Sequence, residues 1–204
     1  MAESRLLIVF VKNARKGRVK TRLAKTIGSE RALLIYRTLL KLTSEMAEKV
    51  NAVRQVWYSD SIELNDMFRK DLFEKFLQKG SNLGERMHHA FDSGFRSGFE
   101  KVLLVGSDCP DISQDLVEKA FRELEDSDMV IGPSRDGGYY LIGFSSHAYD
   151  PDIFEGIKWS TPVVLSQTLE IAERKGLSTA RLAVLNDIDT EEDLNQSRLQ
   201  LEQE

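Results

Sequence analysis

The sequence has a single cysteine and no long apolar run. One cysteine excludes an intramolecular disulfide framework and a cysteine-rich zinc site. The longest apolar run near the start covers the six residues 6–11, whereas a signal-peptide core needs roughly 7–15 residues and a membrane-spanning helix roughly 20. Glu3 and Lys12 flank this run, which is not the pattern of a secretion signal. We therefore predict a cytoplasmic protein without a membrane span.

Basic residues are also fewer than acidic residues. The chain has 28 Lys and Arg against 33 Asp and Glu, a formal net charge of −5, which argues against nucleic acid as a partner. Its three histidines form no metal-binding or catalytic pattern. His88 and His89 are consecutive in a predicted helix and diverge from one another, and His147 stands alone. We assign no chemistry to any histidine.

The 204 residues predict one domain over 1–204 in which strands alternate with helices. This alternation is typical of an α/β domain with a mostly parallel central sheet. Such sheets bind ligands beyond the carboxyl ends of their strands. The expected strands cover 6–11, 53–58, 102–105, 129–131, 139–144 and 182–185. The expected helices cover 29–50, 84–99, 113–124 and 161–175, and a last one opens near Thr190.

A basic loop follows the first expected strand. No acidic residue lies between Ser4 and Ser29, and the part of this stretch that follows the expected strand holds seven basic side chains: Lys12, Arg15, Lys16, Arg18, Lys20, Arg22 and Lys25. Gly17 within it permits close approach of the backbone to a ligand. Lysine and arginine in this position favour a diphosphate or triphosphate. The alternative is a solvated loop, since the spacing is not that of a Walker A loop.

Aspartates follow two other expected strands. Ser107 and Asp108 come directly after 102–105, where a carboxylate and Mg²⁺ or Mn²⁺ would meet phosphate oxygens. Asp187 and Asp189 alternate in an extended segment and share one side of it, so either could complete the metal site. Helix capping is the competing explanation for Asp111 or Ser113 and for Asp189 or Thr190. Cys109 is interpreted as buried packing rather than as a nucleophile.

Two further motifs admit both a structural and a functional interpretation. Asp136, Gly137 and Gly138 suit a hairpin turn, or a wall against which a sugar or acceptor lies, with Asp136 acting as base. Trp159 precedes Thr161 and Pro162, which fit a helix start, and its ring could stack on a ligand. Taken alone, both motifs favour the structural interpretation.

Six segments in this order resemble the bacterial glycosyltransferase-A-type family of arsenosugar-biosynthesis-like glycosyltransferases. That family is similar to the nucleotide-diphospho-sugar transferase superfamily, which includes molybdenum-cofactor and phospholactate guanylyltransferases. The sequence departs from the family at ARKG in the first loop, at Asn82 where aspartate is common, and at a single aspartate before Cys-Pro. The six segments are GRVKTRLA, NLGERM, GSDCPD, GPSRDGGYYLIG, FEGIKWSTPVVLSQTL and NDIDTEEDL.

The resemblance implies a three-layer α/β/α sandwich of the glycosyltransferase-A type. It implies that Asp108 takes the metal-binding part of the aspartate motif and that Asp187 and Asp189 match a late aspartate pair. It places Gly17, Lys20 and Arg22 at the nucleotide phosphates, and we assign Lys12 and Ser107 to the same nucleotide site. It places residues 136–138 and 159–161 on the acceptor side.

Three functions fit these residues. The first is glycosyl transfer from a nucleotide-diphospho-sugar to a small acceptor, with a divalent metal at Asp108 and with Asp136 or Glu85 orienting the acceptor hydroxyl. The second is nucleotidyl transfer from a nucleoside triphosphate to a phosphorylated acceptor. The third is a nucleotide-binding protein without catalytic activity. The resemblance favours the first, although the residues themselves indicate only phosphate and metal.

Overall fold

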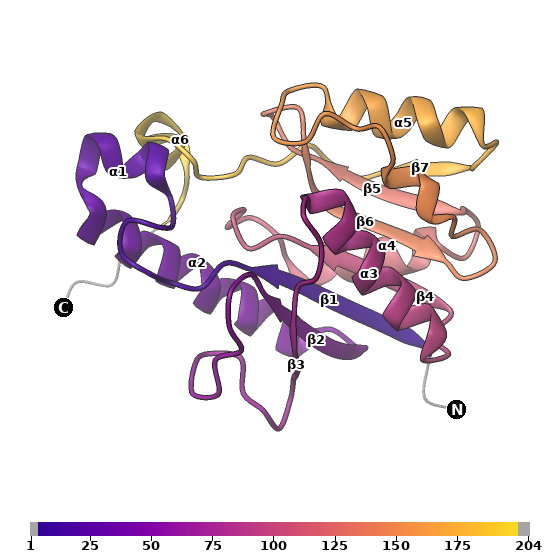
Figure 1. The fold of residues 1–204 in the computed structure, drawn as a ribbon, viewed down its shortest axis with the longest axis horizontal. Coiled ribbons are helices and arrows are strands. Elements are labelled where there is room, and N and C mark those ends of the chain that lie inside the picture. Colours follow the sequence, from indigo (N-terminus) through magenta and orange to yellow (C-terminus); the bar gives the residue numbers. More distant parts are fainter. Residues whose placement is uncertain (1–3, 200–204) are drawn as a thin grey trace.

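The computed structural model describes residues 4–199 and contains one seven-stranded sheet in the order β3-β2-β1-β4-β6-β5-β7 (Figure 1). All neighbouring strands are parallel except β6, which runs antiparallel to both β4 and β5. The strands are β1 Arg5–Val11, β2 Val53–Tyr58, β3 Glu74–Leu77, β4 Lys101–Val105, β5 Met129–Pro133, β6 Tyr139–Ser145 and β7 Thr179–Arg181. The helices are α1 Thr21–Ile27, α2 Ser29–Lys49, α3 Leu83–Arg96, α4 Gln114–Glu123, α5 Val164–Arg174 and α6 Glu191–Gln196, with a 3-10 turn η1 at Pro151–Phe154.

Helices cover both faces of the sheet, so the predicted three-layer sandwich is confirmed. Alternate residues of β1 point to opposite faces, as in any strand. Leu7 and Val9 belong to a core that includes residues of α2 and α4, whereas Leu6 and Ile8 belong to a core that includes residues of α3 and α5. Strands buried on both faces explain the continuous apolar run at 6–11.

The strand order places the loops after β1 and β4 side by side. Strand β1 pairs with β2 on one side and with β4 on the other. The strand order therefore reverses direction beside β1, and ligands of open α/β sheets bind at such a point. Because β6 is antiparallel to β4, its first residues lie at the same edge, where the Gly106 N–H donates to the Tyr140 carbonyl at 3.0 Å. Three segments distant in sequence therefore meet at one edge of the sheet.

Most predicted elements are confirmed, and two differ. The last strand, expected at 182–185, lies instead at Thr179–Arg181, and of the expected residues only Leu185 makes an isolated bridge, to Ser134. The helix expected at 161–175 is α5, which begins at Val164 rather than at Thr161, because Val163 occupies the N-cap position. Ser113, not Asp111, caps α4, and Thr190 caps α6.

Within residues 4–199, the helices are all too short or too polar to cross a membrane.

Candidate functional site

A buried lysine lies at the centre of the site. Lys20 ends the basic loop at the N-cap of α1, with a left-handed backbone (φ 47°), and its side chain is 3% exposed. Its Nζ lies 2.6 Å from Oδ1 of Asp108 and 3.2 Å from Oδ1 of Asp189. Burial alone would lower the pKa of Lys20, but the two carboxylates outweigh it and raise that pKa. The lysine is therefore held as a cation between two aspartates.

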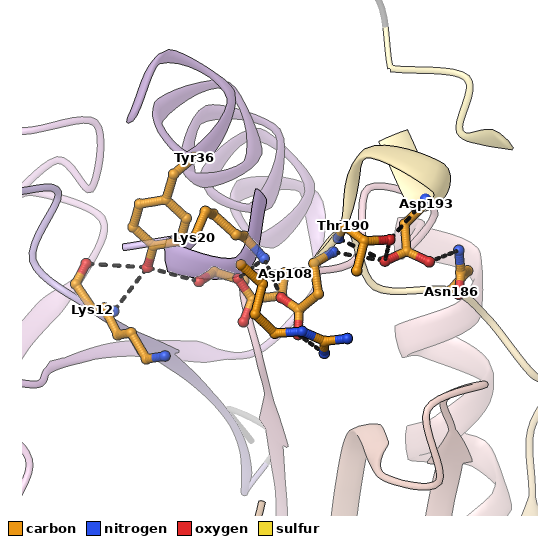
Figure 2. Close-up of polar contacts among 10 residues, drawn as sticks. Lys12, Lys20, Tyr36, Asp108, Asn186, Thr190 and Asp193 are labelled. Atoms are coloured by element: carbon orange, nitrogen blue, oxygen red, sulfur yellow. Dashed lines mark hydrogen bonds and ion pairs between the residues drawn. The ribbon is translucent and has the colours of Figure 1, made fainter. Parts of the chain in front are cut away.

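The last segment of the chain supplies one of these aspartates. The Ile188 N–H donates to the Asp108 carbonyl at 3.0 Å, which fixes residues 187–189 against the loop after β4. Directly beyond, Thr190 and Asp193 form a reciprocal capping box at the start of α6, and Asn186 lies beside Asp193 (Figure 2). The cap thus determines how the segment carrying Asp187 and Asp189 enters the site.

Asp187 lies in a concentration of negative charge. Burial, together with the nearby charges of Asp108, Asp136 and Asp189, raises the pKa of its carboxyl to about 7, while Lys20 opposes the rise. The structure therefore brings together the aspartates that the sequence placed after two different strands and in the hairpin turn. Such a position favours either the protonated, neutral form of the Asp187 carboxyl or a cation bound beside it.

Tyr36 on α2 joins the two loops that carry Lys12 and Ser107, two residues predicted for the nucleotide site. Its hydroxyl accepts a hydrogen bond from the Lys12 N–H at 2.8 Å, lies 3.1 Å from the Lys12 carbonyl and lies 3.3 Å from the Ser107 hydroxyl (Figure 2). Burial raises the pKa of Tyr36, with Asp108 adding to the effect. In the sequence Tyr36 counts only as one position of an apolar helix stripe, so its polar role was not predicted.

The basic loop does not act as one cluster. Lys12, Arg18, Lys20 and Arg22 line a cavity of about 170 Å³ together with Asp108 and Asp189. Lys16 instead pairs with Glu30, and Arg15 donates to the Ser61 hydroxyl at 3.1 Å. Gly17 turns the loop with φ 74° and faces open space rather than a packed neighbour. The positive cavity has the charge and the donors expected of a phosphate site.

A larger cavity of about 350 Å³ continues from the basic one, because both are lined by Lys12, Tyr36 and Asp108. Its size lies within the usual range for small-molecule sites. Its lining includes Ser107, Asp187, Gln78 and Arg86. The sequence contains Arg86 within the segment NLGERM, but nothing in its spacing indicated a cavity.

The hairpin turn between β5 and β6 is held by its own aspartate. Asp136 Oδ1 accepts from the Ser134 hydroxyl and from the Gly138 N–H. Gly137 has φ 90°, and a Cβ there would lie 2.1 Å from the Pro162 carbonyl oxygen. The turn therefore packs directly against the segment before α5, and the glycine is needed for that contact.

The remaining acceptor-side residues make local contacts. The Trp159 ring packs so closely on Gly84 that a Cβ there would lie 2.7 Å from it. The Thr161 hydroxyl donates to the Lys158 carbonyl at 2.6 Å. Both carboxylate oxygens of Glu85 accept hydrogen bonds from Ser81, and this lowers the pKa of Glu85. These residues shape the loops beside the site, and their roles toward an acceptor stay predictions.

Across residues 4–199, no three metal-binding side chains come together in the manner of an all-protein metal centre. Asp189 is engaged by Lys20 and lies 3.8 Å from Arg22. Lys20 also contacts Asp108, at 2.6 Å, but Asp108 lines both cavities and Asp187 lines the larger one, so both present carboxylate oxygens there. Mg²⁺ commonly binds through one or two carboxylates together with substrate phosphates. The donor set fits that mode rather than a closed cage.

A family model matches residues 41–161, and its description is "Uncharacterized protein conserved in bacteria (DUF2064)". The chain belongs to this DUF2064 family. A solved protein from Desulfovibrio desulfuricans G20, described as a candidate nucleotide-diphospho-sugar transferase, is 35% identical over 95% of this chain and 85% of its own, with a TM-score of 0.89. The predicted superfamily is thereby confirmed, while the arsenosugar-type subgroup stays a prediction.

Two further relatives of this DUF2064 protein are more distant. The 2-phospho-L-lactate guanylyltransferase of Methanocaldococcus fervens is 25% identical over 87% of this chain and 78% of its own length. The inositol-1-phosphate CTP transferase of T. maritima is 16% identical over 96% of this chain and 93% of its own, with a TM-score of 0.56, and shows the shared fold alone.

Proposed function

We propose that this chain is a nucleotidyltransferase that moves a nucleoside monophosphate from a nucleoside triphosphate to a small anionic acceptor. The names of its relatives support a nucleotide-dependent transferase in general. The cavity lined by Lys12, Arg18, Lys20 and Arg22 supports binding of several phosphates. The larger cavity beside it has room for the rest of the nucleotide or for the acceptor.

One observation favours nucleotidyl transfer. Asp136 and Glu85, the two carboxylates predicted to activate an acceptor hydroxyl, already accept hydrogen bonds within their own loops. Asp136 closes its own turn, and Glu85 caps its own loop. An acceptor that attacks through a phosphate oxygen is already an anion and needs no base. In this reaction the acceptor oxygen bonds to the α-phosphorus, the bond from that phosphorus to the bridging oxygen of the β-phosphate breaks, and pyrophosphate leaves.

The residues of the site have separate parts in this proposal. Lys20 and Arg22 neutralise the charge that grows on the departing pyrophosphate. Asp108 and Asp187 would hold a Mg²⁺ or Mn²⁺ ion, which when bound polarises the phosphoryl oxygens. Tyr36 keeps Lys12 and Ser107 in register beside the phosphates. Gly137, Gly138, Trp159 and Thr161 are assigned to the acceptor side in this proposal.

Glycosyl transfer is the second candidate, because the Desulfovibrio desulfuricans relative, at 35% identity, bears the name of a nucleotide-diphospho-sugar transferase. The same phosphate site would then bind the diphosphate of the sugar donor. The leaving group separates the two reactions, since nucleotidyl transfer releases pyrophosphate and glycosyl transfer releases a nucleoside diphosphate.

The test incubates the purified chain with each nucleoside triphosphate, Mg²⁺ or Mn²⁺, and a panel of phosphorylated small acids that includes 2-phospho-L-lactate, the acceptor named in the guanylyltransferase relative. We expect pyrophosphate and a nucleotidylated acceptor in equal amounts. Asp108→Asn should slow this at least about a hundredfold, the usual effect of losing one group that stabilises transition-state charge. Arg31→Gln, at an exposed position of α2, is the matched control and should not slow it.

Turnover of nucleotide sugars without any pyrophosphate release would contradict nucleotidyl transfer and support glycosyl transfer. Nucleotide binding without turnover of either kind would favour the third function, a nucleotide-binding protein without catalytic activity.

A further inference from the structure

Arg86 is a cation in the larger cavity without an acidic partner among residues 4–199. Its Nε donates to the Gly80 carbonyl at 3.2 Å, and its Nη1 donates to Oε1 of Gln78 at 3.4 Å. The described part of the chain provides no hydrogen bond to its Nη2. Arginine has only donors, so its free edge requires an acceptor from a ligand or from water.

Gln78 fixes the direction in which Arg86 points. The Gln78 Nε2 donates to the carbonyls of Val11 at 3.2 Å and of Trp57 at 2.8 Å, where β1 and β2 end. Two carbonyl acceptors on the nitrogen side leave only the amide oxygen for Arg86. The guanidinium is therefore oriented by the ends of two central strands, and this is a prepared arrangement rather than a mobile surface charge.

The walls of the same cavity are apolar. Phe10, Leu83, Met87 and Leu104 line it together with Arg86 and Gln78. Apolar walls with a few placed polar groups are typical of sites for a flat organic ring. The cavity is also continuous with the basic site through Lys12 and Tyr36, so a nucleotide with its phosphates in the basic site would place its base here.

We propose that Arg86, oriented by Gln78, determines which nucleobase this chain accepts, and that it selects guanine or uracil over adenine or cytosine. Guanine presents O6 and uracil presents O4 as an acceptor, whereas adenine and cytosine present an amino group at the corresponding position. The guanidinium of Arg86, which has only donors, can donate to the oxygen of guanine or uracil but not to the amino group of adenine or cytosine. This proposal rests on the proposed function, because it requires that a nucleotide binds.

The experiment is isothermal titration calorimetry with GTP, ATP, UTP and CTP at fixed Mg²⁺ and salt. For the wild-type chain we expect GTP to bind at least about tenfold more tightly than ATP, or UTP more tightly than CTP by the same factor, since a good arginine–base contact discriminates by roughly 5- to 150-fold. Arg86→Gln should reduce that ratio to near one. Arg86→Lys keeps the positive charge but loses the paired donors of the guanidinium, so it should also reduce the ratio of affinities. If Arg86→Gln does not fold, the result for Arg86→Lys tests the proposal.

Two controls separate base recognition from general charge. Arg96→Gln removes an arginine from the other end of α3, where it pairs with Asp92 at 3.2 Å, and should leave the ratio unchanged. Inorganic tripolyphosphate should bind the wild-type chain and Arg86→Gln equally. The proposal is overturned if the wild-type chain binds all four nucleotides alike, if both Arg86 variants keep the ratio, or if tripolyphosphate weakens as much as GTP. If the wild-type chain binds neither nucleotides nor tripolyphosphate, the proposed function fails as well.

Discussion

Single side chains hold the site together by bridging segments that are far apart in the sequence. Lys20 joins Asp108 and Asp189, and Tyr36 joins Lys12 to Ser107. Removing one member leaves polar groups without partners, and that loss exceeds the net value of the contact itself. We therefore expect the same residues to contribute to both stability and ligand binding.

Lys20→Met should lower the free energy of unfolding by about 1–3 kcal/mol, because Asp108 and Asp189 lose their shared cation while each remains about 40% exposed to water. Urea denaturation measures this. Lys16→Met is the control, since the Lys16–Glu30 pair is exposed to water and screened by it, and should contribute little to stability. Equal losses in the two variants would contradict the role of Lys20.

Tyr36→Phe should cost about 1–2 kcal/mol of stability and also weaken triphosphate binding, because the loops carrying Lys12 and Ser107 lose their common partner. Tyr58→Phe removes a hydroxyl that donates to Asp66 at 2.6 Å, away from the phosphate cavity. It should cost stability without changing affinity. Calorimetry on both variants separates the effects, and unchanged affinity in Tyr36→Phe would refute the coupling.

At the scale of elements, the site depends on close contacts between turns that carry no apolar pattern. The hairpin turn at Gly137 lies against Pro162, and the Leu165 N–H donates to the Gly137 carbonyl at 2.8 Å. Trp159 lies against Gly84 at the start of α3. In both cases a glycine permits the contact, and its partner lies 25 or more positions away in the sequence.

Gly137→Ala should destabilise the fold by about 1–3 kcal/mol more than Gly98→Ala. The two glycines have nearly the same backbone angle, φ 90° and 89°, but only at Gly137 would the added Cβ meet a neighbour. The difference between the variants therefore isolates the packing cost from the cost of the left-handed backbone. Thermal unfolding of both variants gives the comparison, and similar melting temperatures would show that Pro162 moves aside easily.

The sequence predicts elements well where burial is continuous and poorly where a contact is tertiary. Residues 53–58 and the helix from Ser29 are confirmed because their periodicity is long and strong. The strand β3 was not predicted, since Glu74 and Lys75 interrupt any apolar run in its four residues. Thr161 and Pro162 resemble a helix start, but Thr161 bonds to Lys158 instead, so α5 begins later.

The site residues likewise differ in how far the sequence alone could predict them. Lys20, Arg22, Asp108 and Asp189 were predicted because they follow strands, and parallel strands end at one edge. The sequence did not reveal that Lys20 pairs with two of these aspartates, because that depends on the path of residues 182–190 past the end of the sheet. Gln78 and Arg86 carry no spacing signal at all. Their importance arises only from the direction in which the strand ends hold them.

For the whole molecule, acidic side chains with lowered pKa values join distant segments. Hydrogen bonds from Ser178, and secondarily His147, lower the pKa of Asp128, and Lys175 lowers the pKa of Asp150. Because these folded-state pKa values lie below those of the unfolded chain, their stabilisation is complete above about pH 4 and is lost as pH falls through the folded values.

We therefore expect the urea midpoint to fall as the pH is lowered from 5 to 2.5. Asp128→Asn should show a smaller fall, since one of the linked groups no longer titrates. Asp126→Asn is the control, because Asp126 is exposed and its side chain makes no hydrogen bond to residues 4–199. A pH dependence in Asp128→Asn equal to that of the wild-type chain would contradict the role of Asp128.

The return of the last segment to the basic loop also sets the order in which the site is built. Ile188 packs with Leu23 and Ile35 beneath α1, and α6 lies beside α1 in Figure 1. All seven strands end by Arg181, so during synthesis the entire sheet leaves the ribosome before Asp187 and Asp189 do. A nascent chain can thus complete its scaffold while the phosphate site is still missing its last two carboxylates. The proposed capacity to bind a nucleotide therefore depends on a segment that is synthesised only after the sheet.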